Sequence, residues 1–185
     1  QLASDDLLIY LVAYTVVHRG YFAPSFFTDL RLLIEKEVIH WPTVVEEAAR
    51  HHLKIPLYHG LRQLTLADAR TKIPSAVLQQ LAPSSLSERA LNGLFQRFVT
   101  TQPLPELGHF LLWVTQAPGQ RVAWLQRTLF PSSRFLTYRY GNDSAIRPWH
   151  TRIIRWWQLA KAGVLLIFRM LIRLVIGGRI LRRRS

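Results

Sequence analysis

SFFTDLRLLIEKEVIHWPTVVEEAARHHLKIPLYHGLRQL, residues 25–64, is the stretch that decides the fold. Its apolar residues recur every three or four positions, which is the spacing of a helix that packs one face against a core. The pattern restarts at Trp41-Pro42 and at Ile55-Pro56, because proline fits the first turn of a helix and breaks its interior. The stretch therefore predicts three short helices, which must pack together because none buries its apolar face alone.

Each of the three expected helices carries one apolar stripe. Ser25 is the expected N-cap of the first helix, since a serine hydroxyl accepts a hydrogen bond from a free backbone N–H there. The side chains expected to face the core are Phe26, Leu30, Leu33 and Ile34 in the first helix, Val44, Val45, Ala48, Ala49 and His52 in the second, and Leu57, Leu61 and Leu64 in the third. The rest of the chain is expected to build on this trio.

The flanking sequence is helical in pattern as well. Before the trio, Asp5 and Asp6 open an apolar segment that ends in His18-Arg19-Gly20, which predicts a central buried helix with acids at its positive end and glycine after its last turn. After the trio, helices are expected over 73–81, 87–98, 107–116 and 122–130. No stretch alternates apolar and polar residues as a half-buried strand does. We expect an all-α fold, a compact multi-helix bundle of short helices followed by one long C-terminal basic amphipathic helix.

The cluster Gly141-Asn142-Asp143-Ser144 is the best boundary signal in the chain, because these residue types favour turns. We expect a helical domain at 1–141, a linker at 142–147, and a basic amphipathic helix with an arginine-rich end at 148–185.

The positive charge is unevenly distributed. The chain has a formal net charge of +13, and residues 147–185 contain ten Lys and Arg and no acid. Residues 1–146 have a net charge of +3. Any attraction of this chain for an anionic partner is therefore expected from the tail.

The tail from Pro148 to Leu181 has two chemically distinct faces. One arc of about 120° holds Arg155, Gln158, Lys161, Arg169 and Arg173, and large apolar residues fall on the opposite side. Such a helix lies in the headgroup layer of an anionic membrane. The residues expected to contact the membrane are Trp156, Trp157, Phe168, Arg169, Arg173, Arg182, Arg183 and Arg184.

Other interpretations of the tail remain open. It is also compatible with a helix docked on another part of the protein with its arginines in water. A membrane-spanning helix is less favoured, since Arg169 and Arg173 would then lie near mid-bilayer. Binding to nucleic acid is the weakest interpretation, because no nucleic-acid-binding motif accompanies the bases.

Composition excludes several classes of site. The chain contains no cysteine, which excludes disulfides, thiolate zinc sites and cysteine nucleophiles. Asp5 and Asp6 stand where a signal peptide carries positive charge, so no signal peptide is expected. A cytoplasmic location fits both observations. Because Gln1 is not Met and the sequence opens almost directly into a helix, we expect a segment of a longer protein.

No familiar catalytic motif is present. Glu46 and Glu47 are adjacent and diverge, and on a helix Glu35 and Glu37 point about 200° apart. Neither pair is arranged to hold one divalent ion against a phosphate. The seven histidines also lack the spacing of metal ligands. We predict no catalytic residue, metal ligand or cofactor in this chain.

Three residues are candidates for binding a substrate. Asp29 is expected either as a first-turn acid facing the helix dipole or as a buried carboxylate paired with Arg or His. His18 is either that partner or a cation at a helix end. Arg139, between two tyrosines, either holds a phosphate or carboxylate or stacks on a ring.

Residues 4–141 resemble a known family in the order and spacing of scattered short motifs. The motifs are Asp6-Leu7-Leu8, His18, Asp29-Leu30, Leu32-Leu33, Trp41, Val45, Ala48, Leu57, Leu61, Ile73-Pro74, Val77-Leu78, Leu129-Phe130-Pro131-Ser132, Leu136 and Arg139-Tyr140-Gly141. Together they are similar to the C-terminal half of the bacterial family called uncharacterised nucleotidyltransferases.

The resemblance implies a helical region beside a catalytic domain. In that family the metal-binding carboxylates lie in an N-terminal sheet domain, which this sequence lacks, so Mg²⁺ and NTP are expected only with that missing domain. The implied partners are the missing domain and an anionic membrane surface. We therefore expect an accessory or acceptor-binding part of a nucleotidyltransferase-like protein, in the cytoplasm and peripheral to the inner membrane. The alternative is a stand-alone helical interaction module without enzymatic activity.

Overall fold

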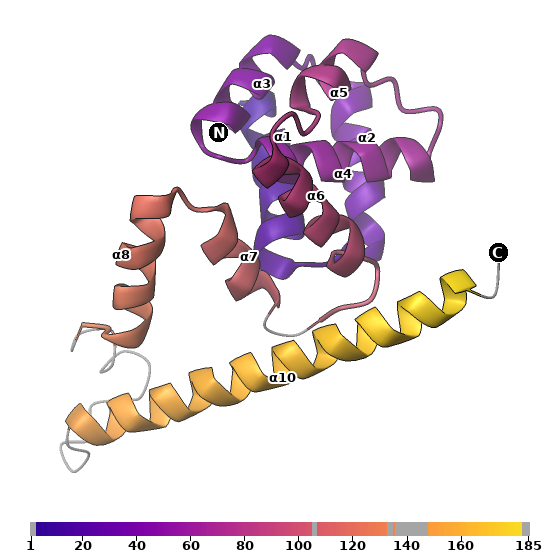
Figure 1. Ribbon diagram of the computed structural model, residues 1–185. Helices are drawn as coiled ribbons and strands as arrows, with labels where there is room; N and C mark the ends of the chain where they lie inside the picture. The colour runs from indigo at the N-terminus through magenta and orange to yellow at the C-terminus, as the bar shows by residue number, and fades with distance from the viewer. Residues whose placement is uncertain (1–2, 105–106, 133–134, 136–147, 183–185) are drawn as a thin grey trace. The chain divides into compact units, whose positions relative to one another are not determined.

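The structure is a computed structural model that describes residues 3–104, 107–132, 135 and 148–182 (Figure 1). The chain divides into two compact units, Gln1–Thr115 and Gln116–Ser185. The described residues form helices and no strand, and a single isolated bridge pairs Tyr21 with Thr100. The expected all-α fold is therefore confirmed.

The first unit contains eight helical segments in its described part. They are α1 (Ser4–Ala13), the π-helix η1 (Tyr14–Arg19), α2 (Pro24–Lys36), α3 (Trp41–Arg50), α4 (Lys54–Ala67), α5 (Ser75–Leu81), α6 (Leu86–Phe98) and α7 (Leu107–Thr115). The described part of the second unit contains α8 (Pro118–Leu129) and α10 (Pro148–Arg182).

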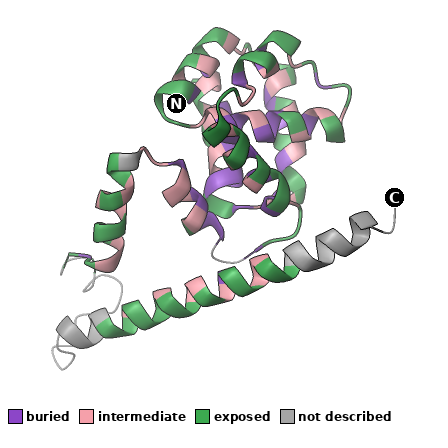
Figure 2. Ribbon diagram, in the orientation of Figure 1, coloured by how far each residue is buried: buried purple, intermediate pink, exposed green. Residues whose placement is uncertain are grey.

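The core of the first unit lies around the α1–η1 rod and α4. The rod contacts α2, α3, α4 and α7, while α4 also contacts α5 and α6. Side chains with no more than 1% exposure come from every helix of the unit, among them Leu8, Val12, Val16, Leu30, Val44, Leu57, Leu61, Leu64, Leu81, Phe95, Leu107 and Leu111. Figure 2 shows buried positions, coloured purple, on the helices of this unit. The predicted third stripe of the trio is confirmed, since Leu57, Leu61 and Leu64 are all in the core.

The beginnings of two helices differ from the sequence expectation. Ala23 is the N-cap of α2, and Pro24 takes its first position, so Ser25 is an exposed first-turn residue rather than the cap. The helix expected to start at Ser87 is α6. It begins at Leu86, because Ser85 and Glu88 form a reciprocal capping box. The hydrogen bond that the backbone N–H of Ser84 donates to the Glu88 carboxylate is the main reason that the pKa of Glu88 is lowered to about 2.

The second stripe of the trio ends before His52. Val44 and Ala48 are buried, but His52 is exposed and adopts a left-handed conformation with φ 58°. The N–H of Leu53 donates to the carbonyl of Ala48 at 2.7 Å, and the N–H of His52 donates to that of Ala49 at 3.2 Å. This pair of bonds is the Schellman closure of a helix, which usually places glycine where His52 stands.

Glycines allow two close contacts with the central rod. A Cβ on Gly108 of α7 would lie 1.8 Å from the carbonyl oxygen of His18 in η1. A Cβ on Gly60 of α4 would lie 2.6 Å from a methyl of Val12 in α1. Both helices therefore approach the rod more closely than any side chain at these positions would permit.

In the second unit, side chains of α10 close the end of α8. The Nε of Arg155 donates to the carbonyl of Thr128 at 2.9 Å, and the indole N–H of Trp156 donates to that of Leu129 at 2.7 Å. The last carbonyls of a helix have no partner within it, and positive charge is favourable there. The helix expected over 148–181 is present, and the linker expected at 142–147 lies outside the described residues.

Candidate functional surfaces

The division of the chain separates the charge completely. The first unit has ten Lys and Arg and ten Asp and Glu, so its formal net charge is zero. The second unit has fourteen Lys and Arg and a single acid, Asp143, so it holds the whole net charge of +13. A surface for an anionic partner is therefore to be sought in the second unit.

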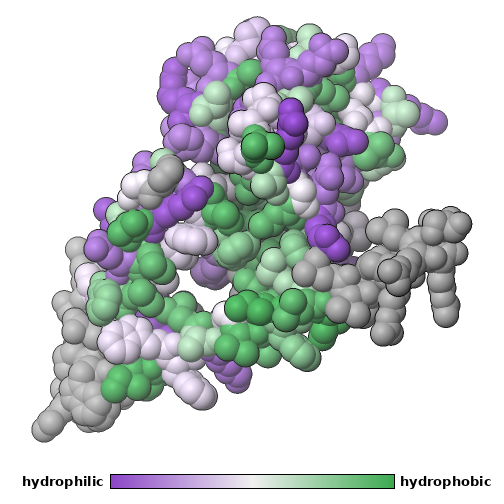
Figure 3. Space-filling view, viewed as in Figure 1, coloured by the Kyte–Doolittle hydropathy of each residue, from purple (hydrophilic) through white to green (hydrophobic). Residues whose placement is uncertain are grey.

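Helix α10 leaves one apolar face uncovered. Trp157, Val164, Ile167, Phe168 and Leu171 fall within one arc of about 100° around the helix axis. Each of these side chains is between 53% and 72% exposed. Figure 3 shows hydrophobic residues gathered along this helix. We call these five residues the apolar stripe, because together they form a continuous exposed face of the described helix.

The predicted membrane-contacting residues have different environments. Trp157 and Phe168 belong to the apolar stripe, whereas the indole N–H of Trp156 is used to bind the end of α8. Arg169 is half-buried and takes part in an interaction within the structure. The side chains of Arg173 and Arg182, and all of Arg183 and Arg184, lie outside the described residues.

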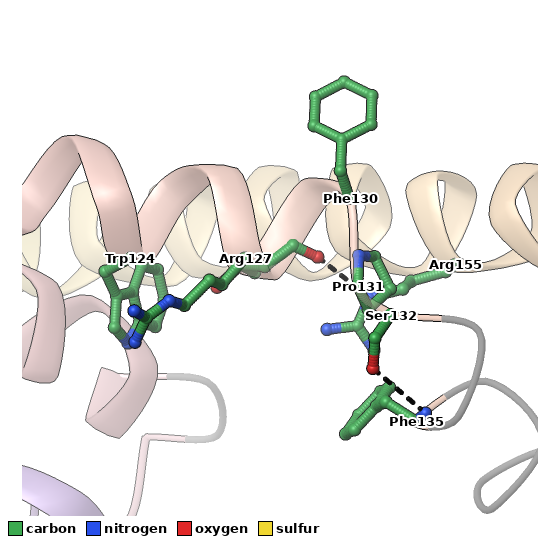
Figure 4. A pocket seen from close by; sticks show the side chains of 8 residues that line it. Trp124, Arg127, Phe130, Pro131, Ser132, Phe135 and Arg155 are labelled. Atoms are coloured by element: carbon green, nitrogen blue, oxygen red, sulfur yellow. Dashed lines mark hydrogen bonds between the residues drawn. The ribbon is translucent and has the colours of Figure 1, made fainter.

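An open pocket of about 550 Å³ lies within the second unit, where α8 meets α10 (Figure 4). It is lined by Trp124, Arg127, Thr128, Phe130, Pro131, Ser132, Phe135 and Arg155. The guanidinium of Arg155 lies over the ring of Phe135, 4.9 Å from its centroid. This volume is in the range of small-molecule sites.

The predicted substrate-binding residues do not form one site among the described residues. His18 is exposed at the end of η1 and stacks on Tyr14, with ring centroids 5.1 Å apart. Asp29 is exposed and lies beyond the first turn of α2, so neither expected environment for this carboxylate is present. No ion pair or hydrogen bond joins His18 to Asp29, and Arg139 lies outside the described residues. Their role in substrate binding stays a prediction.

The sequence analysis did not select His59, the histidine of the first unit whose pKa is shifted furthest from its ordinary value. Its side chain is 1% exposed and its ring lies between those of Phe22 and Phe95. Burial lowers the pKa of His59 to about 4, and the nearby charge of Arg62 contributes in the same direction. Its Nε2 lies 3.4 Å from the carbonyl of Val99. His59 is therefore a neutral core residue.

Two classes of site are not found in the part of the chain that the structure describes. No three side chains of His, Asp or Glu gather there as a metal site would require. Likewise, none of the described helices combines the length and apolar character needed to cross a bilayer.

Comparisons with protein-family models, curated proteins and solved structures found no match to this chain. The nucleotidyltransferase resemblance therefore stays a prediction from the sequence.

Proposed function

We propose that this chain attaches a helical accessory region to an anionic membrane surface through α10. The observation that supports this proposal most directly is the apolar stripe, exposed on a unit with a net charge of +13. An amphipathic helix with these properties lies in the plane of the interface, apolar side toward the acyl chains.

Charge and hydrophobicity favour the membrane over other anionic partners. Each Lys or Arg near an anionic surface contributes about 1 kcal/mol of attraction. A nucleic acid would satisfy the bases, but it would leave most of the apolar stripe in water. A lipid interface satisfies both, because headgroups contact the bases while the acyl region receives side chains such as Phe168.

The proposed context is a nucleotidyltransferase-like protein at the inner face of a bacterial membrane. Its support is the resemblance of residues 4–141 to the helical half of that family. In this proposal the first unit supports the catalytic domain or its acceptor, and the second unit holds both at the membrane. The competing proposal is a helical interaction module that carries no enzyme.

The membrane proposal is tested by sedimentation with vesicles of phosphatidylcholine, with and without phosphatidylserine. The full chain is expected to sediment with the anionic vesicles. Replacing two residues of the apolar stripe, Phe168→Asp with Leu171→Asp, should weaken that binding more than about tenfold, because each buried large apolar side chain contributes about 1.5–3 kcal/mol.

The matched control is Val38→Asp with Leu86→Asp, which introduces the same charge at exposed apolar positions of the first unit. It should bind nearly as well as the unaltered chain. Equal binding by the stripe variant and the unaltered chain, or no preference for anionic vesicles, would overturn the proposal.

The accessory role has a separate test. The chain alone should transfer no nucleotide to an acceptor with Mg²⁺ and NTP, because the family's carboxylates are expected in another domain. Incorporation of labelled nucleoside monophosphate by a purified sample, abolished by a substitution in this chain, would show that it carries its own active site.

A further inference from the structure

The pocket of the second unit combines cationic and aromatic groups. Trp124, Arg127 and Thr128 come from α8, and Arg155 comes from α10. Trp124 and Arg127 are three residues apart, so their side chains lie on the same face of the helix. Phe130, Pro131, Ser132 and Phe135 complete the lining (Figure 4). Figure 4 shows the Arg127 guanidinium beside Trp124 and turned away from Arg155, so the two cations mark opposite ends of one lining.

No carboxylate balances these two arginines among the described residues. Neither Arg127 nor Arg155 takes part in an ion pair there, and the described residues of the second unit include no Asp or Glu. Two guanidinium groups on one pocket without an acid attract an anion.

The contacts that fix the side chain of Arg155 occupy only some of its hydrogen-bond donors. One N–H donates to the carbonyl of Thr128, and the guanidinium plane packs over Phe135. A guanidinium has five donors, so closing the end of α8 with Nε leaves the terminal nitrogens to bind a ligand. Fixing the side chain in advance reduces the entropy that binding would cost.

Ser132 supplies a third polar group. Its Oγ accepts a hydrogen bond from the backbone N–H of Phe135 at 3.3 Å, which leaves the hydroxyl hydrogen free to donate. Arginine forks and a hydroxyl donor match the several acceptor oxygens of a phosphate better than the single edge of a carboxylate.

We propose that this pocket binds a phosphate ester, with Arg155 and Ser132 on the phosphate and Trp124 against its apolar or aromatic substituent. The exposed side chain of Arg127 turns from Trp124 to join them on the phosphate. The phosphate comes either from a lipid headgroup or from a soluble ester. The proposal does not depend on the membrane proposal, because it is tested with soluble probes and the apolar stripe lies outside the pocket.

The test is calorimetric titration of the full chain with two probes, phenyl phosphate and monomeric dihexanoyl phosphatidic acid. Arg127→Gln should weaken binding about tenfold or more, because a hydrogen bond to a charged group contributes about 1.5–3 kcal/mol. Arg127 is exposed, so this variant is expected to fold. Arg155→Lys keeps the charge but not the planar fork and should also weaken binding.

The matched control is Lys161→Gln, which removes the same charge from an exposed position of α10 outside the pocket. It should change affinity less than twofold. Binding of phenyl phosphate alone would identify a soluble ester, and binding of the short-chain lipid alone would identify a headgroup.

Two results would overturn the proposal. One is the absence of millimolar or tighter binding of either probe by the folded, unaltered chain. The other is equal weakening by Arg127→Gln and Lys161→Gln, which would mean diffuse attraction to a basic surface. Titration of the stripe variant, Phe168→Asp with Leu171→Asp, with phenyl phosphate should match the unaltered chain, and it separates this outcome from failure of the membrane proposal.

Discussion

The two units of this protein use apolar residues in opposite ways. In the first unit, apolar side chains from every described helix are buried in the core around the α1–η1 rod and α4, and acids equal bases in number. In the second unit, α10 exposes an apolar stripe and nearly all charged residues are positive. The first unit thus buries most of its large apolar side chains and balances its charge, whereas the second exposes both an apolar stripe and a net positive charge.

The ion pairs of the first unit illustrate the same contrast. Arg31 pairs with Asp68, and Lys54 pairs with Glu88, whose carboxylate also caps α6. Exposed pairs contribute little stability, about 0–1 kcal/mol each. Their consequence is a surface without strong net attraction for anions, so an anionic partner is expected to meet the second unit first.

The sharpest way to test this comparison is to shorten one leucine in each unit. Leu61→Ala removes a side chain with no exposure from the first core and should cost about 2–5 kcal/mol of unfolding free energy. Leu171→Ala in the apolar stripe should cost less than about 0.5 kcal/mol, because its side chain is largely in water. Urea denaturation followed by circular dichroism measures both. Similar losses would mean that the stripe is part of a core.

A second test concerns the close contact of α7 with η1. Gly108→Ala should cost about 3 kcal/mol, because the new Cβ would overlap a backbone carbonyl that has no rotamer to change. Gly93→Ala in α6 is the matched control, since no atom lies within 4 Å of its Cβ position. That control should stabilise the protein by about 0.5–1 kcal/mol through helix propensity. A tolerated Gly108→Ala would contradict the described contact.

A third test uses the pH dependence of the first unit. Between the ordinary pKa of 6.5 and the folded value of about 4, the unfolded chain takes up a proton at His59 and the folded chain does not. Stability should therefore fall as the pH decreases through this window, by about 2–3 kcal/mol in all.

The matching variant is His59→Gln, which removes the titration while keeping a polar side chain of similar size. Unfolding free energies at about pH 7 and pH 5 should then differ much less in the variant. Both pH values lie above 4.5, the ordinary pKa of Glu, and only below it does the stabilising contribution of Glu88, whose folded pKa is about 2, begin to decline. An unchanged pH slope would place His59 in contact with water.

The smallest expected effect is at the end of α3. His52→Gly should stabilise the first unit by about 0.4–1 kcal/mol, because glycine adopts the left-handed conformation without strain. Thermal unfolding measures the change, with exposed His51→Gly as the control that should destabilise or leave stability unaltered. Vesicle binding through α10 should be identical in both variants, since neither alters the second unit.

Much of the fold follows from local sequence. The prolines at positions 42 and 56 separate the helices of the trio, and the three-and-four spacing identifies Leu57, Leu61 and Leu64 as core residues. The unbroken apolar and basic pattern after residue 147 predicts α10 to within one residue of its end. These features are predictable because they depend on neighbours within one helical turn or two.

Other features depend on residues that are distant in sequence. The burial of His59 requires Phe22 and Phe95 on either side, and the close contact at Gly108 requires the carbonyl of His18. The cap of α2 differs for a local reason instead, because Pro24 beside Ser25 takes the first position of the helix and makes Ala23 the cap.

The sequence by itself determined that the chain is helical, where most helices lie, and that its positive charge is concentrated toward the C-terminal end. Only the tertiary structure decided where the neutral unit ends, which apolar residues stay exposed, and that Arg127 and Arg155 share a pocket. The physical reason is how far apart in the sequence the interacting residues lie. Helical periodicity and charge are properties of consecutive residues, whereas burial and pocket composition depend on which surfaces meet after the chain has folded.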